Sequence, residues 1–172
     1  MPLDLKQFIR SVQDFPQAGI LFRDITPLLG NGEAFQSALS RFQELLKDEK
    51  IDKVVGIESR GFIFGAPLAE RLGVGFAMAR KAGKLPADKI SVEYDLEYGT
   101  NIIEMHSDSI TKGERIFIID DVLATGGTAN ATITLVEQLG GEVLGLAFLI
   151  ELKFLEGRKL LPGRAVYNLI EY

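Results

Sequence analysis

The stretch from residue 116 to residue 128, IFIIDDVLATGGT, decides the fold. Its four leading apolar residues, 116–119, are typical of a central parallel strand that is buried on both faces. The run ends in Asp120-Asp121, and a glycine-containing loop then leads into a helical pattern over 128–139. Strand, loop and helix in this order predict one unit of an α/β protein with parallel strands.

The same alternation continues on both sides of this stretch. Apolar runs predict strands at 53–57, 75–79 and 143–150. Apolar residues at helical spacing predict helices over 33–50 and 62–72. We therefore expect a central, mainly parallel sheet with helices on both sides, joined by right-handed crossovers.

Two regions fall outside this alternation. Near the N-terminus, Leu5, Phe8, Ile9 and Val12 recur at helical spacing and predict a short helix that stops before Pro16, followed by an irregular but ordered segment over 16–32. Residues 81–109 have few regularly spaced apolar positions and are expected to form a β-hairpin or lid, because connections this long in compact domains are usually functional or disordered. Neither region looks like a linker, so we expect a single domain over 1–172.

Composition excludes several classes of function. The 172 residues carry 19 Lys and Arg against 24 Asp and Glu, a net charge of −5 that argues against a general nucleic-acid binder or a protein of acidic membranes. With no Cys and one His, a disulfide, a thiolate nucleophile, a Cys-ligated zinc and a multi-His metal site are all ruled out. Neither a secretory signal nor an apolar stretch of ~18 residues is present, and a cytoplasmic location is the expectation.

The loop after the strand has the features of a phosphate site. Gly126 and Gly127 let backbone N–H groups approach an anion, Thr125 and Thr128 add hydroxyl donors, and the start of the helix contributes a positive dipole end. The two common nucleotide motifs, G-x-x-x-x-G-K-[ST] and G-x-G-x-x-G, do not occur here. Because carboxylates suit the hydroxyls of a cis-diol, Asp120-Asp121 beside this loop indicates a ribose 5-phosphate. The alternative is that Asp120-Asp121 only cap a turn and Gly126-Gly127 only mark the start of a helix. That alternative would suffice for an isolated DD or GG, but it explains the two occurring together less well.

A second group of polar residues follows the strand predicted at 53–57. In Glu58-Ser59-Arg60-Gly61 the arginine can offer a planar fork of donors to a diphosphate, at the sheet edge where open α/β sheets bind ligands. Arg80, Lys81 and Lys84 form a basic cluster at the start of the long excursion. For these residues a surface ion pair or a solvated turn remains the alternative.

The acidic pair followed by A-T-G-G-T resembles the phosphoribosyl-diphosphate signature of the type I phosphoribosyltransferases. Three further segments resemble the adenine phosphoribosyltransferases in particular: FPQAGILFRDITPLL at 15–29, GIESRGFIFGAPLAERLGVGF at 56–76, and ARKAGKLP followed by YDLEYG at 79–99. The resemblance implies the α/β fold of the type I phosphoribosyltransferases, with a small N-terminal, base-binding hood over about 1–32 and a long flexible lid over about 81–109. It also implies a non-proline cis peptide bond in the turn at 58–61.

The resemblance also implies roles for individual residues. Backbone groups of Leu21 and Arg23 would read the adenine edge, with Phe22 stacked on the ring and Val122 on the other side of the base. The ribose hydroxyls would meet Asp120 and Asp121, and the 5′-phosphate would meet Ala124, Thr125, Gly126, Gly127 and Thr128. Diphosphate would be held by Ser59, Arg60, Arg80 and Lys81, and the catalytic residues would be Arg60 and, from the lid, Glu97 and Tyr98.

The reaction implied joins adenine to 5-phospho-α-D-ribose 1-diphosphate, giving AMP and diphosphate. Magnesium would be held through substrate oxygens and water, without a protein ligand, and a homodimer is expected. Two alternatives stay open: a phosphoribosyltransferase for a 6-oxopurine, and a non-catalytic sensor of phosphoribosyl diphosphate. The segments at 15–29 and 94–99 disfavour the first, and the presence of Glu97 and Tyr98 disfavours the second.

Overall fold

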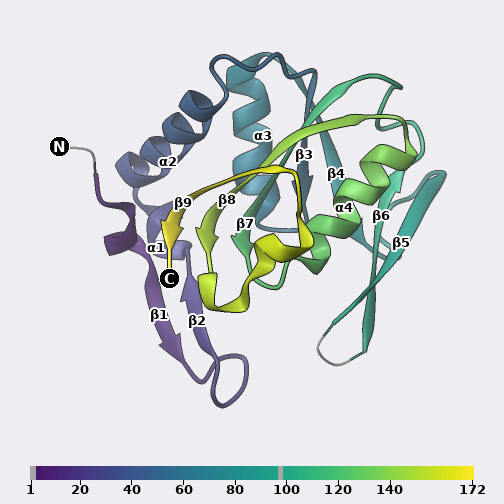
Figure 1. The fold of residues 1–172 in the computed structure, drawn as a ribbon. Coiled ribbons are helices and arrows are strands. Elements are labelled where there is room, and N and C mark those ends of the chain that lie inside the picture. The colour runs from purple at the N-terminus through teal and green to yellow at the C-terminus, as the bar shows by residue number, and fades with distance from the viewer. Residues whose placement is uncertain (1–2, 97–98) are drawn as a thin grey trace.

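A seven-stranded sheet forms the centre of the molecule (Figure 1). The computed structural model describes residues 3–96 and 99–172. The strand order is β5-β6-β4-β3-β7-β8-β9. Five neighbouring strands run parallel: β4 (Gly75–Lys81), β3 (Lys53–Ile57), β7 (Arg115–Leu123), β8 (Glu142–Glu151) and β9 (Ala165–Glu171). The predicted mainly parallel sheet is confirmed.

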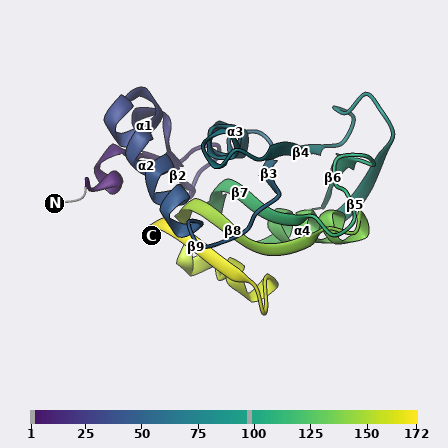
Figure 2. The ribbon, with the colours of Figure 1, turned by 90° about the horizontal axis from the view of Figure 1, so that it is seen from above.

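Helices cover both faces of the sheet (Figure 2). On one face lie α2 (Gly32–Leu45) and α3 (Gly61–Leu72), and on the other lies α4 (Gly127–Gln138). Successive strand residues point to opposite faces, so Val54 packs into one hydrophobic cluster and Val55 into the other. The central strands are therefore buried on both sides, as their uninterrupted apolar runs predicted.

Two element ends differ from the sequence-based expectation. The helix predicted over 33–50 ends at Leu45, because its apolar face runs out before the polar segment 47–50. The strand predicted over 116–119 continues to Leu123, since β7 keeps pairing with β8 as far as Leu123 opposite Glu151. The acidic pair consequently lies inside the last part of a strand and not in the loop after it.

The N-terminal helix predicted over 5–12 is wrong. Only a single 3₁₀ turn, η1 (Leu5–Phe8), forms, and β1 (Arg10–Gln13) follows it. β1 pairs antiparallel with β2 (Leu21–Asp24), placing Val12 opposite Phe22. This pairing, which suits β-branched Val12, overrides the helical spacing. The segment expected to be irregular thus contains β2 and a short helix, α1 (Thr26–Gly30); we call the β1–β2 sheet the hood.

The segment 81–109, which was predicted to form a β-hairpin or a lid, contains a β-hairpin. β5 (Lys89–Asp95) pairs antiparallel with β6 (Thr100–His106), and β6 joins the main sheet antiparallel to β4. Ile90, Val92 and Tyr94 alternate with polar residues and pack against the cluster beneath α4. This alternation is the signal in the sequence that identifies the strand.

The last strand, β9, was not predicted. Between β8 and β9 the chain forms two short 3₁₀ turns, η2 (Lys153–Leu155) and η3 (Gly157–Leu160). β9 lies at the edge of the sheet and is only partly buried, so its sequence lacks the long apolar run of β7 and β8.

Candidate active site

A cavity of about 520 Å³ lies at the carboxyl ends of the central strands. Figure 1 shows the hood on one side of this sheet edge and the β5–β6 hairpin on the other. Open α/β sheets bind ligands at this edge. The cavity is lined by Ile20, Leu21, Phe22, Arg23, Ile57, Glu58, Ser59, Arg60, Lys81, Tyr94, Ile103, Asp120, Asp121, Val122, Ala124, Thr128 and Leu152.

The hood supplies an aromatic and apolar wall. Phe22 packs edge-to-face against Phe15, with ring centroids 5.1 Å apart, and the Arg60 guanidinium lies 5.4 Å from the Phe22 ring centroid. Arg23 turns toward the C-terminus, where its guanidinium lies 3.6 Å above the Tyr172 ring. These contacts hold a short, exposed β-ribbon that could not be stable alone.

The turn between β3 and α3 brings an arginine to the sheet edge. Its Glu58–Ser59 peptide bond is cis, as the resemblance implied. Arg60 directly precedes α3, and its Nε lies 2.6 Å from Asp121 Oδ2. Gly61 makes this approach feasible, because a Cβ at that position would lie 2.8 Å from the Ile119 carbonyl oxygen and 3.0 Å from Asp120 Oδ1.

The acidic pair is electrostatically unfavourable in the free protein. Burial, and then the charge of Asp121, raise the pKa of Asp120 well above its ordinary value. Asp120 Oδ1 accepts the Asp121 backbone N–H at 2.8 Å. Asp121 Oδ2 is buried and forms the ion pair with Arg60, and among the described residues it accepts no hydrogen bond of good geometry. Oxygens of this kind are ready to accept hydrogen bonds from a ligand's hydroxyl groups.

A smaller hollow of about 70 Å³ adjoins the cavity at the glycine loop. Gly126 adopts φ +89°, a left-handed conformation that favours glycine, and α4 begins at the next residue without a side-chain cap. Its first backbone N–H groups therefore point into a site suited to an anion. The hollow is lined by Asp120, Val122, Leu123, Ala124, Thr125, Gly126, Gly127, Thr128, Ala129 and Phe148.

Two lining residues with polar roles were missed by the sequence-based interpretation. Thr128 Oγ1 donates to the Tyr94 hydroxyl oxygen at 3.0 Å, which ties the root of the hairpin to the glycine loop. Glu58 accepts hydrogen bonds from Arg80 Nε at 3.2 Å, from the Lys81 backbone N–H at 2.9 Å, and from Lys84 Nζ. Burial alone would raise the pKa of Glu58, but these bonds outweigh it and lower the pKa. The signal for Tyr94 was the alternation in β5; for Glu58 it was the basic cluster at 80–84.

Most of the predicted site residues lie together. The cavity is lined by the predicted residues of the hood, of the turn at 59–60 and of the acidic pair, and by Lys81, Val122, Ala124 and Thr128. The adjoining hollow is lined by the remaining loop residues, Thr125, Gly126 and Gly127. Arg80 is held by Glu58 and does not line the cavity. Glu97 and Tyr98 lie outside the described residues, so their roles stay predictions.

The described ranges, 3–96 and 99–172, were searched for metal-ligand clusters and for membrane-spanning helices. They contain no group of three or more Asp, Glu or His side chains placed to hold a metal ion. No helix among them is long and apolar enough to cross a membrane.

Comparison with known proteins gives consistent matches along the whole chain. Residues 31–161 match the phosphoribosyl transferase domain. The chain is 58% identical over 170 residues to the adenine phosphoribosyltransferase of Thermotoga maritima, covering 99% of this chain and 98% of that protein. The crystal structure of adenine phosphoribosyltransferase from Thermoanaerobacter pseudethanolicus superposes with a TM-score of 0.95 at 50% identity, covering 98% of each chain. The enzyme from Saccharomyces cerevisiae, complexed with adenine and an imino-altritol bisphosphate, gives a TM-score of 0.91 at 43% identity, with 96% of each chain covered.

Proposed function

The chain belongs to the adenine phosphoribosyltransferases, which join adenine to 5-phospho-α-D-ribose 1-diphosphate in purine salvage, and we propose that the cavity at the sheet edge performs this reaction with the residue roles below. One observation carries the assignment of roles. Hood, β3–α3 turn, acidic pair and glycine loop come from distant parts of the sequence, yet they line one cavity and its adjoining hollow.

Adenine lies in the part of the cavity lined by the hood. The exposed backbone of Leu21 and Arg23 reads the edge of the base, and Phe22 and Val122 provide apolar surface for the ring. All four residues line the cavity, which supports this placement. A flat apolar slot with a few backbone donors and acceptors is the usual way to select a purine.

The sugar phosphate occupies the acidic pair and the glycine loop. Asp120 and Asp121 accept hydrogen bonds from the ribose hydroxyls, which relieves the repulsion between the two buried carboxylates. The loop from Ala124 to Thr128 binds the 5′-phosphate through backbone N–H groups and hydroxyls at the start of α4. The uncapped start of α4 supports the phosphate placement, and the position of Asp120 and Asp121 in the cavity wall supports the ribose placement.

Diphosphate lies against Ser59 and Arg60, with Lys81 from the following strand, whereas Arg80 does not line this cavity and would contribute from the partner in the dimer proposed below. In the reaction the C1′–O bond breaks with its electron pair going to diphosphate, adenine N9 bonds to C1′, and the N–H proton of the base is released. Arg60 stabilises the charge that develops on the leaving group, while the fixed sugar and base keep the reacting atoms aligned. Glu97 is our candidate acceptor for the proton, and Tyr98 shields the site when the hairpin closes.

Magnesium enters with the substrate. Substrate oxygens and water would supply its ligands, as is usual for this ion with phosphates. When bound, the ion neutralises negative charge on the diphosphate.

We extend the proposal to assembly and location. A homodimer would let the β4 segment of one subunit act at the other's site, which suits the position of Arg80 away from its own cavity. A cytoplasmic enzyme suits a phosphorylated substrate and product, which do not cross lipid bilayers unaided. Light scattering of the purified protein tests the first point: a monomer mass would contradict it.

The decisive experiment measures diphosphate release with magnesium and phosphoribosyl diphosphate, offering adenine, hypoxanthine, guanine or xanthine. We expect turnover with adenine alone, and its loss in the Asp120→Asn/Asp121→Asn double variant. Turnover with an oxopurine would contradict the proposed base site. Unchanged turnover in the double variant would contradict the proposed sugar site.

A further inference from the structure

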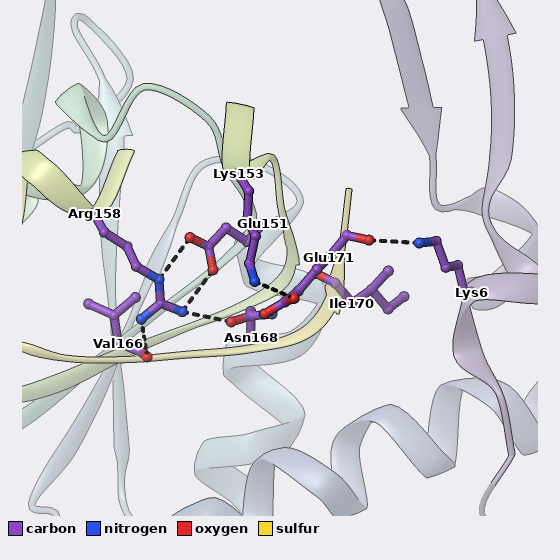
Figure 3. A network of polar contacts seen from close by, with 8 residues as sticks. All are labelled: Lys6, Glu151, Lys153, Arg158, Val166, Asn168, Ile170 and Glu171. Atoms are coloured by element: carbon purple, nitrogen blue, oxygen red, sulfur yellow. Dashed lines mark hydrogen bonds and ion pairs between the residues drawn. The ribbon is translucent and has the colours of Figure 1, made fainter. Parts of the chain in front are cut away.

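Glu151 and Arg158 form an ion pair at the end of β8 (Figure 3), and neither residue lines the cavity or the hollow. Glu151, the last residue of β8, is buried, and both of its carboxylate oxygens accept hydrogen bonds from Arg158, from Nε and Nη2, each at 2.7 Å. Such a two-point contact fixes direction as well as distance. Arg158 also donates to β9, from Nη1 to the Val166 carbonyl at 2.8 Å and from Nη2 to Asn168 Oδ1 at 2.7 Å.

The residue before this arginine touches the glycine loop directly. A Cβ on Gly157 would lie 2.3 Å from the Ala124 carbonyl oxygen and 3.0 Å from the Leu123 side chain. A Cβ on Gly126 would lie 2.4 Å from the Gly157 carbonyl oxygen. The two backbones are therefore packed without room for a side chain between them, and we call this contact the Gly157 seam.

The Gly157 seam makes the position of the glycine loop depend on the position of Gly157. Loop residues Ala124 and Gly126 have their backbone against Gly157, and Gly157 is bonded to a residue whose guanidinium is fixed to two strands. Phosphate binding through backbone N–H groups depends on where the backbone lies, because displacement weakens several hydrogen bonds at once.

We propose that Arg158 is a positioning residue for the 5′-phosphate: through the Gly157 seam it holds the glycine loop in its binding conformation. This inference rests on the proposed placement of the 5′-phosphate in that loop. Arg158 touches neither the cavity nor the hollow, so its effect acts through Gly157.

The chain offers a matched control for the loss of an ion pair. Arg115 also contacts one carboxylate at two points, Nε to Asp52 Oδ2 at 3.0 Å and Nη2 to Asp52 Oδ1 at 2.9 Å. This pair lies at the start of β3 and β7, the opposite edge of the sheet from the site. Arg115→Ala removes a comparable fork without disturbing the seam.

The test compares Arg158→Ala, Arg158→Lys and Arg115→Ala in the full-length protein, well below their melting temperatures. Measured quantities are KM for phosphoribosyl diphosphate, KM for adenine, kcat, and the Kd of AMP by calorimetry. For Arg158→Ala we expect KM for phosphoribosyl diphosphate and Kd for AMP to rise on the order of tenfold, the effect of weakening one charge-assisted hydrogen bond. KM for adenine should stay within about twofold, Arg158→Lys should be intermediate, and Arg115→Ala should leave all four values unchanged.

A second variant probes the seam without changing charge. Gly157→Ala must displace the glycine loop, and we expect the same selective rise in KM for phosphoribosyl diphosphate; it decides the question if Arg158→Ala does not fold. Equal effects of Arg158→Ala and Arg115→Ala, or unchanged phosphate affinity in Gly157→Ala, would overturn the inference. The Thr125→Ala/Thr128→Ala double variant distinguishes failure of the phosphate placement from failure of the positioning role. If the double variant binds AMP as tightly as the parent, the placement of the 5′-phosphate is contradicted. If the double variant loses AMP affinity but Gly157→Ala does not, only the positioning role is contradicted.

Discussion

Arg60 and Asp121 form an ion pair across the site, with Arg60 Nε 2.6 Å from Asp121 Oδ2. The arginine starts α3 and the aspartate lies in β7, so the pair joins the proposed diphosphate turn to the proposed ribose site. When the substrate binds, Arg60 has to turn to the diphosphate and Asp121 to the sugar, which breaks the ion pair between them. The geometry couples leaving group and sugar through one contact.

Arg60→Lys tests that coupling. Lysine keeps the charge but loses the planar fork, and we expect kcat/KM for phosphoribosyl diphosphate to fall on the order of 10²-fold, a typical loss for one electrostatic donor at a reacting centre. Steady-state kinetics provide the measurement. Arg71→Lys, on the same helix and hydrogen-bonded to Ser40, is the control and should remain as active as the parent. Equal activities of the two variants would contradict a role for the Arg60 fork.

Asp120→Asn should make the free protein more stable and less active. The pKa of Asp120 is raised above its ordinary 3.8, so the stability linked to its proton is present below pH 3.8 and lost as the pH rises through the folded-state pKa. At pH 7 the amide avoids this loss, and we expect a melting temperature roughly 2–4 °C higher, corresponding to about 1 kcal/mol. Thermal unfolding checks this, with exposed Asp48→Asn as control. A lower melting temperature for Asp120→Asn at pH 7 would show that ionised Asp120 is not a destabilising group.

Gly61→Ala should displace the β3–α3 turn. The added Cβ would meet the Ile119 carbonyl oxygen at 2.8 Å, which the backbone can avoid only by moving. We expect a loss of about 1–3 kcal/mol in the free energy of unfolding, from overpacking, and a higher KM for phosphoribosyl diphosphate. Denaturant titration and kinetics measure the two effects. Gly32→Ala, where a Cβ meets no atom within 4 Å, should be neutral in both; the idea fails if Gly61→Ala behaves the same way.

Acid unfolding should reveal the Asp52–Arg115 pair. Hydrogen bonds from the Arg115 side chain and then its backbone lower the pKa of Asp52 from 3.8 to about 2. The linked stability is therefore present above pH 3.8 and lost as the pH falls through about 2. The melting-temperature difference between the parent and Asp52→Asn should be largest above pH 4 and shrink toward pH 2. A difference that stays constant over this range would contradict the lowered pKa.

Several features could be predicted from local sequence because local physics determines them. The apolar run Lys53–Ile57 is β3 to the residue, and the starts of α3 and α4 lie within one residue of prediction. The acidic pair, the glycine loop and the Arg60 turn are each contiguous, and all follow buried strands. Their meeting in one cavity follows from parallel topology, which brings the carboxyl ends of neighbouring strands to one edge.

Only the tertiary structure determined the remaining features. Residues 10–13 are a strand because Leu21–Asp24 pairs with them, and β9 is a strand because β8 offers an edge; in both cases the partner lies in a different segment of the chain. Glu58 binds the basic cluster 22 to 26 residues away, and Gly157 packs on Gly126. The sequence by itself determined the central strands, the helices that cover them and the chemical groups, since burial pattern and residue type act locally. Pairing, close backbone contact and the partners of buried charges depend on residues brought together by folding, and the tertiary structure alone decided them.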